Sequence, residues 1–177
     1  VGDYDDDLKA VVTGTRDKVA EKMADLRVAD SMTEIFNLFR RCNRYIDETM
    51  PWVLAKDEAS KDRLATVLYN LVEGITIGAS LLSPYMPETS EKIFAQLNTS
   101  MVEFDNLATF GNYKSGTKVT EKPQILFARL DEKEVMEKAK VLMEKQAASV
   151  KAANAAVEED TVIDIEPKAE ITFDDFT

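Results

Sequence analysis

The sequence predicts an all-α protein: a bundle of about four helices, followed by a short irregular segment and a long linker helix. Glycine and proline are scarce, with six and five among 177 residues, so long stretches contain neither helix breaker. Within these stretches apolar side chains recur at three- and four-residue spacing, the pattern of one buried helix face. Hydrophobic residues make up 45% of the chain, which is sufficient for the core of one domain, with or without a tail.

The first helix is predicted over residues 5–26. It begins with three aspartates at positions 5–7, and negative charge is favourable at the positive end of the helix dipole. Its apolar side chains form a single stripe, as expected for a helix that packs with one face against a bundle. The stripe consists of Leu8, Val11, Val12, Thr15, Val19, Met23 and Leu26.

The second helix is predicted over residues 30–50. Asp30 or Ser31 can serve as its N-cap, and Glu34 stands at capping-box spacing from Ser31. Pro51 ends the helix, because the residue before a proline is disfavoured in helical geometry. Its expected inward face consists of Ile35, Leu38, Phe39, Cys42, Tyr45, Ile46 and Thr49.

Two further helices are predicted over residues 58–82 and 87–97. Gly74 and Gly78 lie four residues apart on the first of them, which indicates close contact with a neighbouring helix. The Ser–Pro pair that ends in Pro84 separates the two helices, and the second begins with a proline, a residue favoured at the first helical position.

The rest of the chain is predicted to lose the bundle pattern. Residues 98–129 contain breakers and no helical period, with a short extended stretch at 124–128. A helical pattern resumes over 131–158, rich in alanine, glutamate and lysine and therefore expected to be half solvated. Residues 159–177 are acidic and carry two runs of β-favouring residues without partner strands, which suggests the start of a further domain.

The composition excludes several kinds of active site. The chain contains no histidine and one cysteine, Cys42, which removes Ser–His and Cys–His nucleophile pairs, four-ligand Cys/His zinc sites and the di-iron sites of helical bundles. No phosphate-binding glycine loop is present, so no catalytic residue and no metal ligand is assigned. A lone cysteine fits a reducing compartment, and neither a signal sequence nor an apolar run of membrane-spanning length is found, so we expect a cytoplasmic protein that contacts no membrane.

The acidity of the chain is concentrated in its last part. The net charge is −11, which a globally basic nucleic-acid-binding protein would not have. Residues 130–177 carry 13 acidic and six basic side chains, whereas residues 28–56 are balanced, with four of each. The four basic residues of this neutral centre are Arg40, Arg41, Arg44 and Lys56.

The segment Asn43–Lys56 stands out because it holds the only tryptophan. Trp52 follows the proline that ends a helix carrying Arg40 and Arg44 one turn apart. An indole fixed by a rigid turn beside guanidinium groups can act as a stacking platform with phosphate anchors. The alternative is that Trp52 plugs the end of the bundle while the arginines form ion pairs at four-residue spacing.

Asn43–Lys56 resembles the signature of the anticodon-binding helical domain of methionyl-tRNA synthetases, which are class I aminoacyl-tRNA synthetases. The resemblance extends through Arg63–Leu71 and through Leu81–Thr89, where a Leu-Ser-Pro-Tyr-Met-Pro phrase links the last two bundle helices. At the end of the chain, Ile171–Phe176 resembles the opening of the OB-fold tRNA-binding domain that many bacterial members append.

This resemblance implies recognition of the CAU anticodon of methionine tRNA, both initiator and elongator. It assigns the base-packing role to Trp52 and suggests RNA contacts for Arg44, Asn43 and Lys56. Asn37 and Arg41 have the spacing of an Asn/Arg pair that the family uses on an earlier helix, but they lie on the tryptophan-bearing helix, so that role is not carried over.

The resemblance also predicts the domain organisation. Residues 1–129 would be the anticodon-binding bundle, lacking its first helix, residues 130–158 the linker helix, and residues 159–177 an acidic linker and the start of a missing OB-fold. No cofactor is expected in this fragment, which would be non-catalytic. The parent enzyme would use ATP, with zinc as an option, in an upstream domain, to attach methionine to tRNA, and it could form a homodimer through the missing domain.

Two alternative functions stay open at this point. The chain could be a structural or assembly bundle that mediates protein contacts, or the same domain of another class I synthetase. Exposure of Trp52 separates the first alternative from RNA binding, because a ring enclosed by the bundle would favour the structural role.

Overall fold

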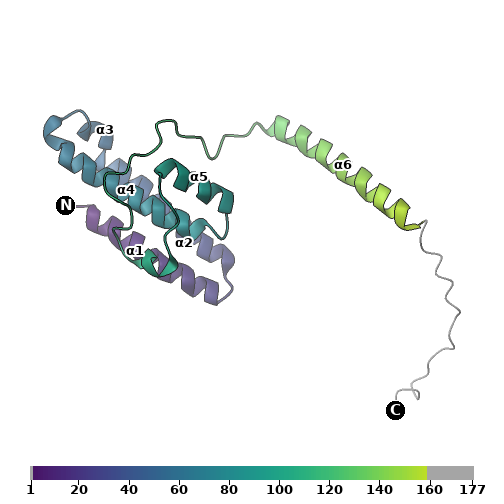
Figure 1. Ribbon diagram of the computed structural model, residues 1–177, viewed down its shortest axis with the longest axis horizontal. Helices are drawn as coiled ribbons and strands as arrows, with labels where there is room; N and C mark the ends of the chain where they lie inside the picture. The colour runs from purple at the N-terminus through teal and green to yellow at the C-terminus, as the bar shows by residue number, and fades with distance from the viewer. Residues whose placement is uncertain (1, 159–177) are drawn as a thin grey trace, which may run out of the picture. The chain divides into compact units, whose positions relative to one another are not determined.

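The computed structural model of the chain describes residues 2–158 and is helical wherever it is regular, without a strand among those residues. The all-α prediction is therefore confirmed. The described residues fall into two units, one up to Leu126 and one from Phe127 onward, and each is considered by itself. The elements in Figure 1 are α1 (Asp5–Ala24), α2 (Val28–Thr49), α3 (Pro51–Leu54), the 3₁₀ turn η1 (Glu58–Ser60), α4 (Lys61–Leu82), α5 (Pro87–Leu97), the 3₁₀ turn η2 (Phe104–Ala108) and α6 (Glu132–Glu158).

Helix α4 lies at the centre of the first unit and contacts α1, α2, α3, α5 and η2 (Figure 1). Its two glycines allow this close packing. A Cβ atom on Gly78 would lie 2.7 Å from the Phe39 ring, and one on Gly74 would lie 3.0 Å from the sulfur of Cys42. The predicted role of these glycines in helix contact is thus confirmed.

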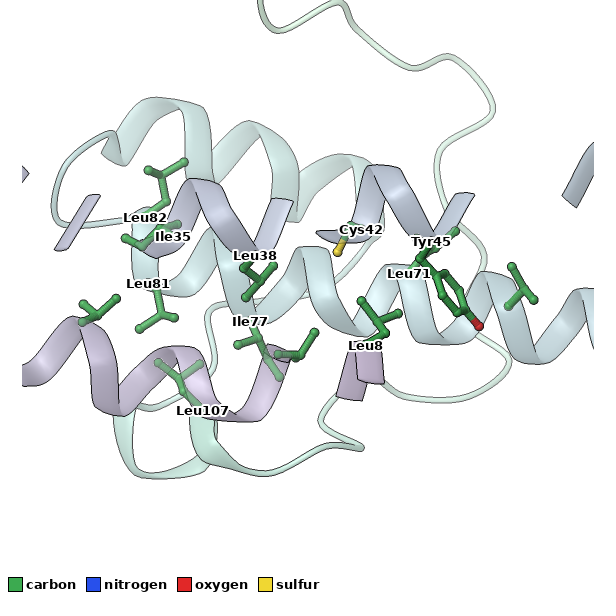
Figure 2. Close-up of a cluster of buried hydrophobic side chains, with 13 residues drawn as sticks. Leu8, Ile35, Leu38, Cys42, Tyr45, Leu71, Ile77, Leu81, Leu82 and Leu107 are labelled. Carbon is green, nitrogen blue, oxygen red and sulfur yellow. The ribbon is translucent and has the colours of Figure 1, made fainter. Parts of the chain in front are cut away.

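The hydrophobic core runs along the interior of the bundle (Figure 2). Its buried members come from α1, α2, α4 and η2. They are Leu8, Val12, Val19, Ile35, Leu38, Cys42, Tyr45, Val67, Leu71, Ile77, Leu81, Leu82 and Leu107. Most of the predicted stripe of α1 is inside, but Met23 and Leu26 at its end are exposed, because the helix ends at Ala24.

One stretch, Glu58–Leu82, is long and apolar enough to cross a membrane, with a mean hydropathy of 1.4. It is not an uninterrupted apolar run, because Asn70 and Glu73 lie within it. In addition, 61% of the apolar window is buried inside the protein. Its apolar character is accounted for by its central place in the bundle.

Three local predictions differ from the structure. Helix α2 begins at Val28, and Ser31 does not cap it, because its buried hydroxyl donates to the Val28 carbonyl at 2.7 Å and lies 2.6 Å from the Tyr85 hydroxyl. Pro51 ends α2 as predicted, but the connection in which Trp52 was expected contains the one-turn helix α3. Residues 124–128 are irregular, since no strand is available to pair with them, and the 3₁₀ turn η2 was not anticipated.

Helix α6 begins where its sequence pattern predicted. The side chain of Asp131 accepts hydrogen bonds from the backbone N–H groups of Lys133 and Glu134, at 2.9 and 3.3 Å, and so caps the first turn. Large apolar side chains of this helix are exposed, among them Met136, Leu142 and Met143. The predicted acidic segment and OB-fold opening at 159–177 lie outside the described residues.

Candidate functional site

The turn between α2 and α3 fixes the position of Trp52. Met50 adopts left-handed geometry, with φ 44° and ψ 63°, which is uncommon for a residue other than glycine. Its N–H closes α2 on the Ile46 carbonyl at 2.9 Å, and its own carbonyl accepts from the Val53 N–H at 2.8 Å to start α3. Pro51 occupies the first position of α3, where its missing N–H costs no hydrogen bond.

Helix α3 presents an apolar surface to solvent. Trp52 is 52% exposed, and its neighbours Met50 and Val53 are exposed to 46% and 48%. Only Leu54 of this turn packs against the hydrophobic core. The indole is therefore not enclosed by the bundle, which is the condition under which the sequence favoured RNA binding over a structural plug.

Two arginines of α2, Arg41 and Arg44, are held by the carboxylate of Glu48. Glu48 accepts a hydrogen bond from Arg44 Nε at 2.8 Å and another from Arg41 at 3.0 Å. Arg41 is largely buried and also donates to Asp7 of α1 at 2.5 Å. Arg44 forms the ion pair at four-residue spacing that the sequence left as the alternative, while its side chain stays 77% exposed. The structure thus leaves Arg44 accessible and ties Arg41 to α1.

The remaining candidates lie on the surface of the same region. Asn43 on α2 and Lys56 after α3 are both exposed. Asn37 accepts a hydrogen bond from Arg40, one turn away on α2. The pair of Asn37 and Arg41 therefore does not form a joint site, because Arg41 is engaged with α1.

A buried polar network lies at the same end of the bundle, and the sequence did not reveal it. Asp5 is fully buried and accepts two hydrogen bonds from Arg63, at 2.6 and 2.9 Å, one from the Tyr45 hydroxyl at 2.5 Å and one from the Gly2 N–H at 2.9 Å. The side chain of Asn70 donates to the Tyr45 hydroxyl at 3.1 Å. We call Asp5, Tyr45, Arg63 and Asn70 the Asp5 network.

The electrostatics of this network follow from its hydrogen bonds. Burial alone would raise the pKa of Asp5, but the donors Arg63, Tyr45 and Gly2 outweigh it and hold that pKa well below its ordinary value. Burial, and then the neighbouring Asp5, raise the pKa of Tyr45. Asp5 is therefore ionised and Tyr45 is a neutral donor at physiological pH.

A second buried carboxylate holds the irregular segment against the bundle. Glu73 of α4 accepts hydrogen bonds from the backbone N–H groups of Gly111, Asn112 and Tyr113, at 2.8, 2.7 and 2.6 Å. Gly111 has φ 112°, a conformation that other residues rarely adopt. Within residues 2–158 no three His, Cys, Asp or Glu side chains are grouped so that they could hold a metal ion.

Comparison with known proteins identifies relatives of the whole bundle. A family described as the anticodon binding domain of methionyl tRNA ligase matches residues 1–147. Methionine–tRNA ligase of Clostridium tetani is 48% identical over 127 residues, which are 72% of this chain and 20% of that protein. The corresponding ligase of Clostridium perfringens is 41% identical over 172 residues, 97% of this chain and 25% of that protein.

Solved structures give the same result. Free Mycobacterium tuberculosis methionyl-tRNA synthetase matches with a TM-score of 0.67 and 27% identity, over 74% of this chain and 27% of that one. The same enzyme in complex with methionyl-adenylate matches with a TM-score of 0.65 and 26% identity, over 73% of this chain and 26% of that one. The chain thus spans a fifth to a quarter of the length of these curated relatives.

Proposed function

This chain belongs to the family of anticodon-binding domains of methionyl-tRNA ligases, and from that premise we propose that it recognises the CAU anticodon of methionine tRNA. The observation that supports this most is the half-exposed indole of Trp52, held by the Met50–Pro51 turn. Aromatic side chains that offer one face to solvent bind unpaired bases by stacking.

In this proposal each candidate residue has a separate task. Trp52 stacks on an anticodon base, and Arg44 contacts a phosphate or ribose with the guanidinium edge that Glu48 does not occupy. Asn43, one residue before Arg44, and Lys56, after α3, contribute hydrogen bonds or charge from the rim. Backbone contacts would position the RNA, while the stacked and hydrogen-bonded bases would determine specificity.

For the longer protein we propose the activity that the relatives are named for. A methionine–tRNA ligase of the cytoplasm would activate methionine with ATP in another domain, with zinc there as an option, and then charge initiator and elongator tRNA. The present chain would supply anticodon recognition and no catalytic group. Self-association of the longer protein through a further domain is part of the same proposal.

The test is binding of the chain to labelled RNA hairpins that differ only in the anticodon. Trp52 is the only tryptophan, so quenching of its emission reports stacking directly. We expect weak binding with a preference for the CAU loop, lost in Trp52→Ala. Phe104→Ala is the matched control, because Phe104 is an equally exposed aromatic (52%) on η2. Equal binding to all hairpins would refute anticodon recognition, and absence of binding to any of them would favour the structural or assembly role.

A further inference from the structure

The Asp5 network joins three helices at the end of the bundle that carries Trp52. Asp5 is the first residue of α1, Tyr45 lies one turn before the end of α2, and Arg63 lies in the first turn of α4. Figure 2 shows Tyr45 at one end of the hydrophobic cluster, with Ile35 and Leu82 toward the other. The network is therefore placed where the direction of the α2–α3 turn is determined.

The composition of the network favours a positional role over a stabilising one. A buried ion pair contributes little net stability, because desolvation of the two charges offsets their attraction. Well-packed apolar residues in its place often give the same or greater stability. Here the carboxylate of Asp5 is saturated with four donors, two of them on Arg63. A saturated network of this kind restricts the position of each partner to a narrow range.

Helix α3 depends on its neighbours for its position. It has four residues, none is fully buried, and only Leu54 packs against the hydrophobic core. The hydroxyl of Thr49 donates to the carbonyl of Tyr45 at 2.6 Å, and Met50, which starts α3, follows directly. The last turn of α2 at Tyr45 is thus connected to Trp52 by continuous, hydrogen-bonded backbone.

We propose that Tyr45 is a positioning residue for Trp52: its hydroxyl, held by Asp5 and Asn70, fixes the last turn of α2 so that the indole is oriented to receive a base. This inference rests on the proposed function for its consequence in RNA binding. The orientation of the indole itself is a property of the free protein and can be measured without RNA.

The experiment compares two Tyr→Phe substitutions. Tyr45 lies near the C-terminal end of α2, and Tyr85, from the turn after α4, contacts its N-terminal end. Tyr45→Phe removes the hydroxyl of the Asp5 network and keeps the ring. Tyr85→Phe removes a hydroxyl that lies 2.6 Å from Ser31, about 21 Å along α2 from Tyr45. For both variants of the full chain we would measure the urea midpoint, acrylamide quenching and anisotropy of Trp52, and the affinity for the CAU hairpin at fixed salt.

We expect Tyr45→Phe to raise the quenching of Trp52, lower its anisotropy and weaken hairpin binding roughly two- to twelvefold, the equivalent of one net hydrogen bond. Tyr85→Phe should match wild type in Trp52 quenching, Trp52 anisotropy and hairpin affinity, although its urea midpoint should fall by a similar amount. Equal effects of the two variants, or an unchanged Trp52 signal in Tyr45→Phe, would overturn the inference. If Tyr45→Phe does not fold, Arg63→Lys decides in the same way, since lysine cannot make the two-pronged contact with Asp5.

The two proposals fail in different ways. If Tyr45→Phe changes the Trp52 signal, but neither it nor Trp52→Ala affects hairpin binding, the proposed function is wrong and the positioning of the indole stands. If Trp52→Ala abolishes binding and Tyr45→Phe changes neither signal nor affinity, the positioning inference is wrong and the proposed function stands.

Discussion

If the longer protein is a methionine–tRNA ligase, as proposed, replacement of Trp52 by alanine in it should separate tRNA charging from methionine activation. A stacked base contributes about 1–3 kcal/mol by alanine substitution. Since each 1.36 kcal/mol is tenfold in rate, charging efficiency should fall roughly 5- to 160-fold. Methionine activation with ATP should hardly change, because that chemistry does not involve the α2–α3 turn.

The exposure of Trp52 limits the cost in stability. A fully buried aromatic residue loses about 3–5 kcal/mol when truncated. Trp52 is 52% exposed, so only half of a ring surface of roughly 150–250 Å² is protected from water, which at ~25 cal/mol per Å² gives at most about 2–3 kcal/mol. The variant should therefore stay folded at assay temperature, and Trp52→Phe should retain part of the charging activity.

The assay measures adenylate formation and tRNA charging side by side on the same folded preparation. Thermal unfolding of each variant serves as the control for global damage. Equal losses in both reactions would show that the substitution acts through stability. Undiminished charging would remove Trp52 from the anticodon site altogether.

Three further results are expected. The pKa of Asp5 is lowered in the folded state, so the stability that this carboxylate contributes is present above its ordinary pKa of 3.8 and is lost as the pH falls below that value. The urea midpoint of wild type should therefore drop more steeply from about pH 5 to 2.5 than that of Asp5→Asn. Parallel curves for the two proteins would contradict this. Gly78→Ala should destabilise the fold by about 1–3 kcal/mol, since its Cβ would lie 2.7 Å from Phe39. Gly14→Ala, whose Cβ would have nothing within 4 Å, should stabilise it by about 1 kcal/mol. Equal urea midpoints for the two variants would refute the close contact of Gly78 with α2. The salt dependence of hairpin binding should be shallow, and Arg44→Gln should reduce the slope of log K against log salt by about 0.7; an unchanged slope would mean that Arg44 contacts no phosphate.

The helices could be predicted because their signals are local. Apolar spacing of three and four residues depends only on the helix period, and it placed α1, α2 and α4 to within a few residues. Pro51 and Pro87 act on their own neighbours, and the structure has helix boundaries at both.

The missed tertiary contacts depend on partners distant in sequence. Asp5 was interpreted as a dipole-favouring residue at a helix start, but Arg63, 58 residues away, makes it a buried ion-pair partner. Ser31 was a candidate N-cap of α2, but it lies inside the helix, where its hydroxyl is 2.6 Å from that of Tyr85, 54 residues later. Glu73 gave no signal, since its donors are backbone N–H groups 38 to 40 residues later. Sequence spacing contains no information about such tertiary partners.

The charges near Trp52 explain why the geometry of the indole should matter more than electrostatics. Arg63 is paired with Asp5, and Arg41 is engaged with Asp7 and Glu48. Exposed charges act over about 8 Å at physiological salt, so only accessible cations would attract a bound RNA, and Arg44 of α2 is one that stays exposed. In the proposed complex, affinity would come mainly from base stacking, which depends on the orientation of the ring. If Tyr45 positions the indole as proposed, the Asp5 network would then influence binding more than any single surface cation does.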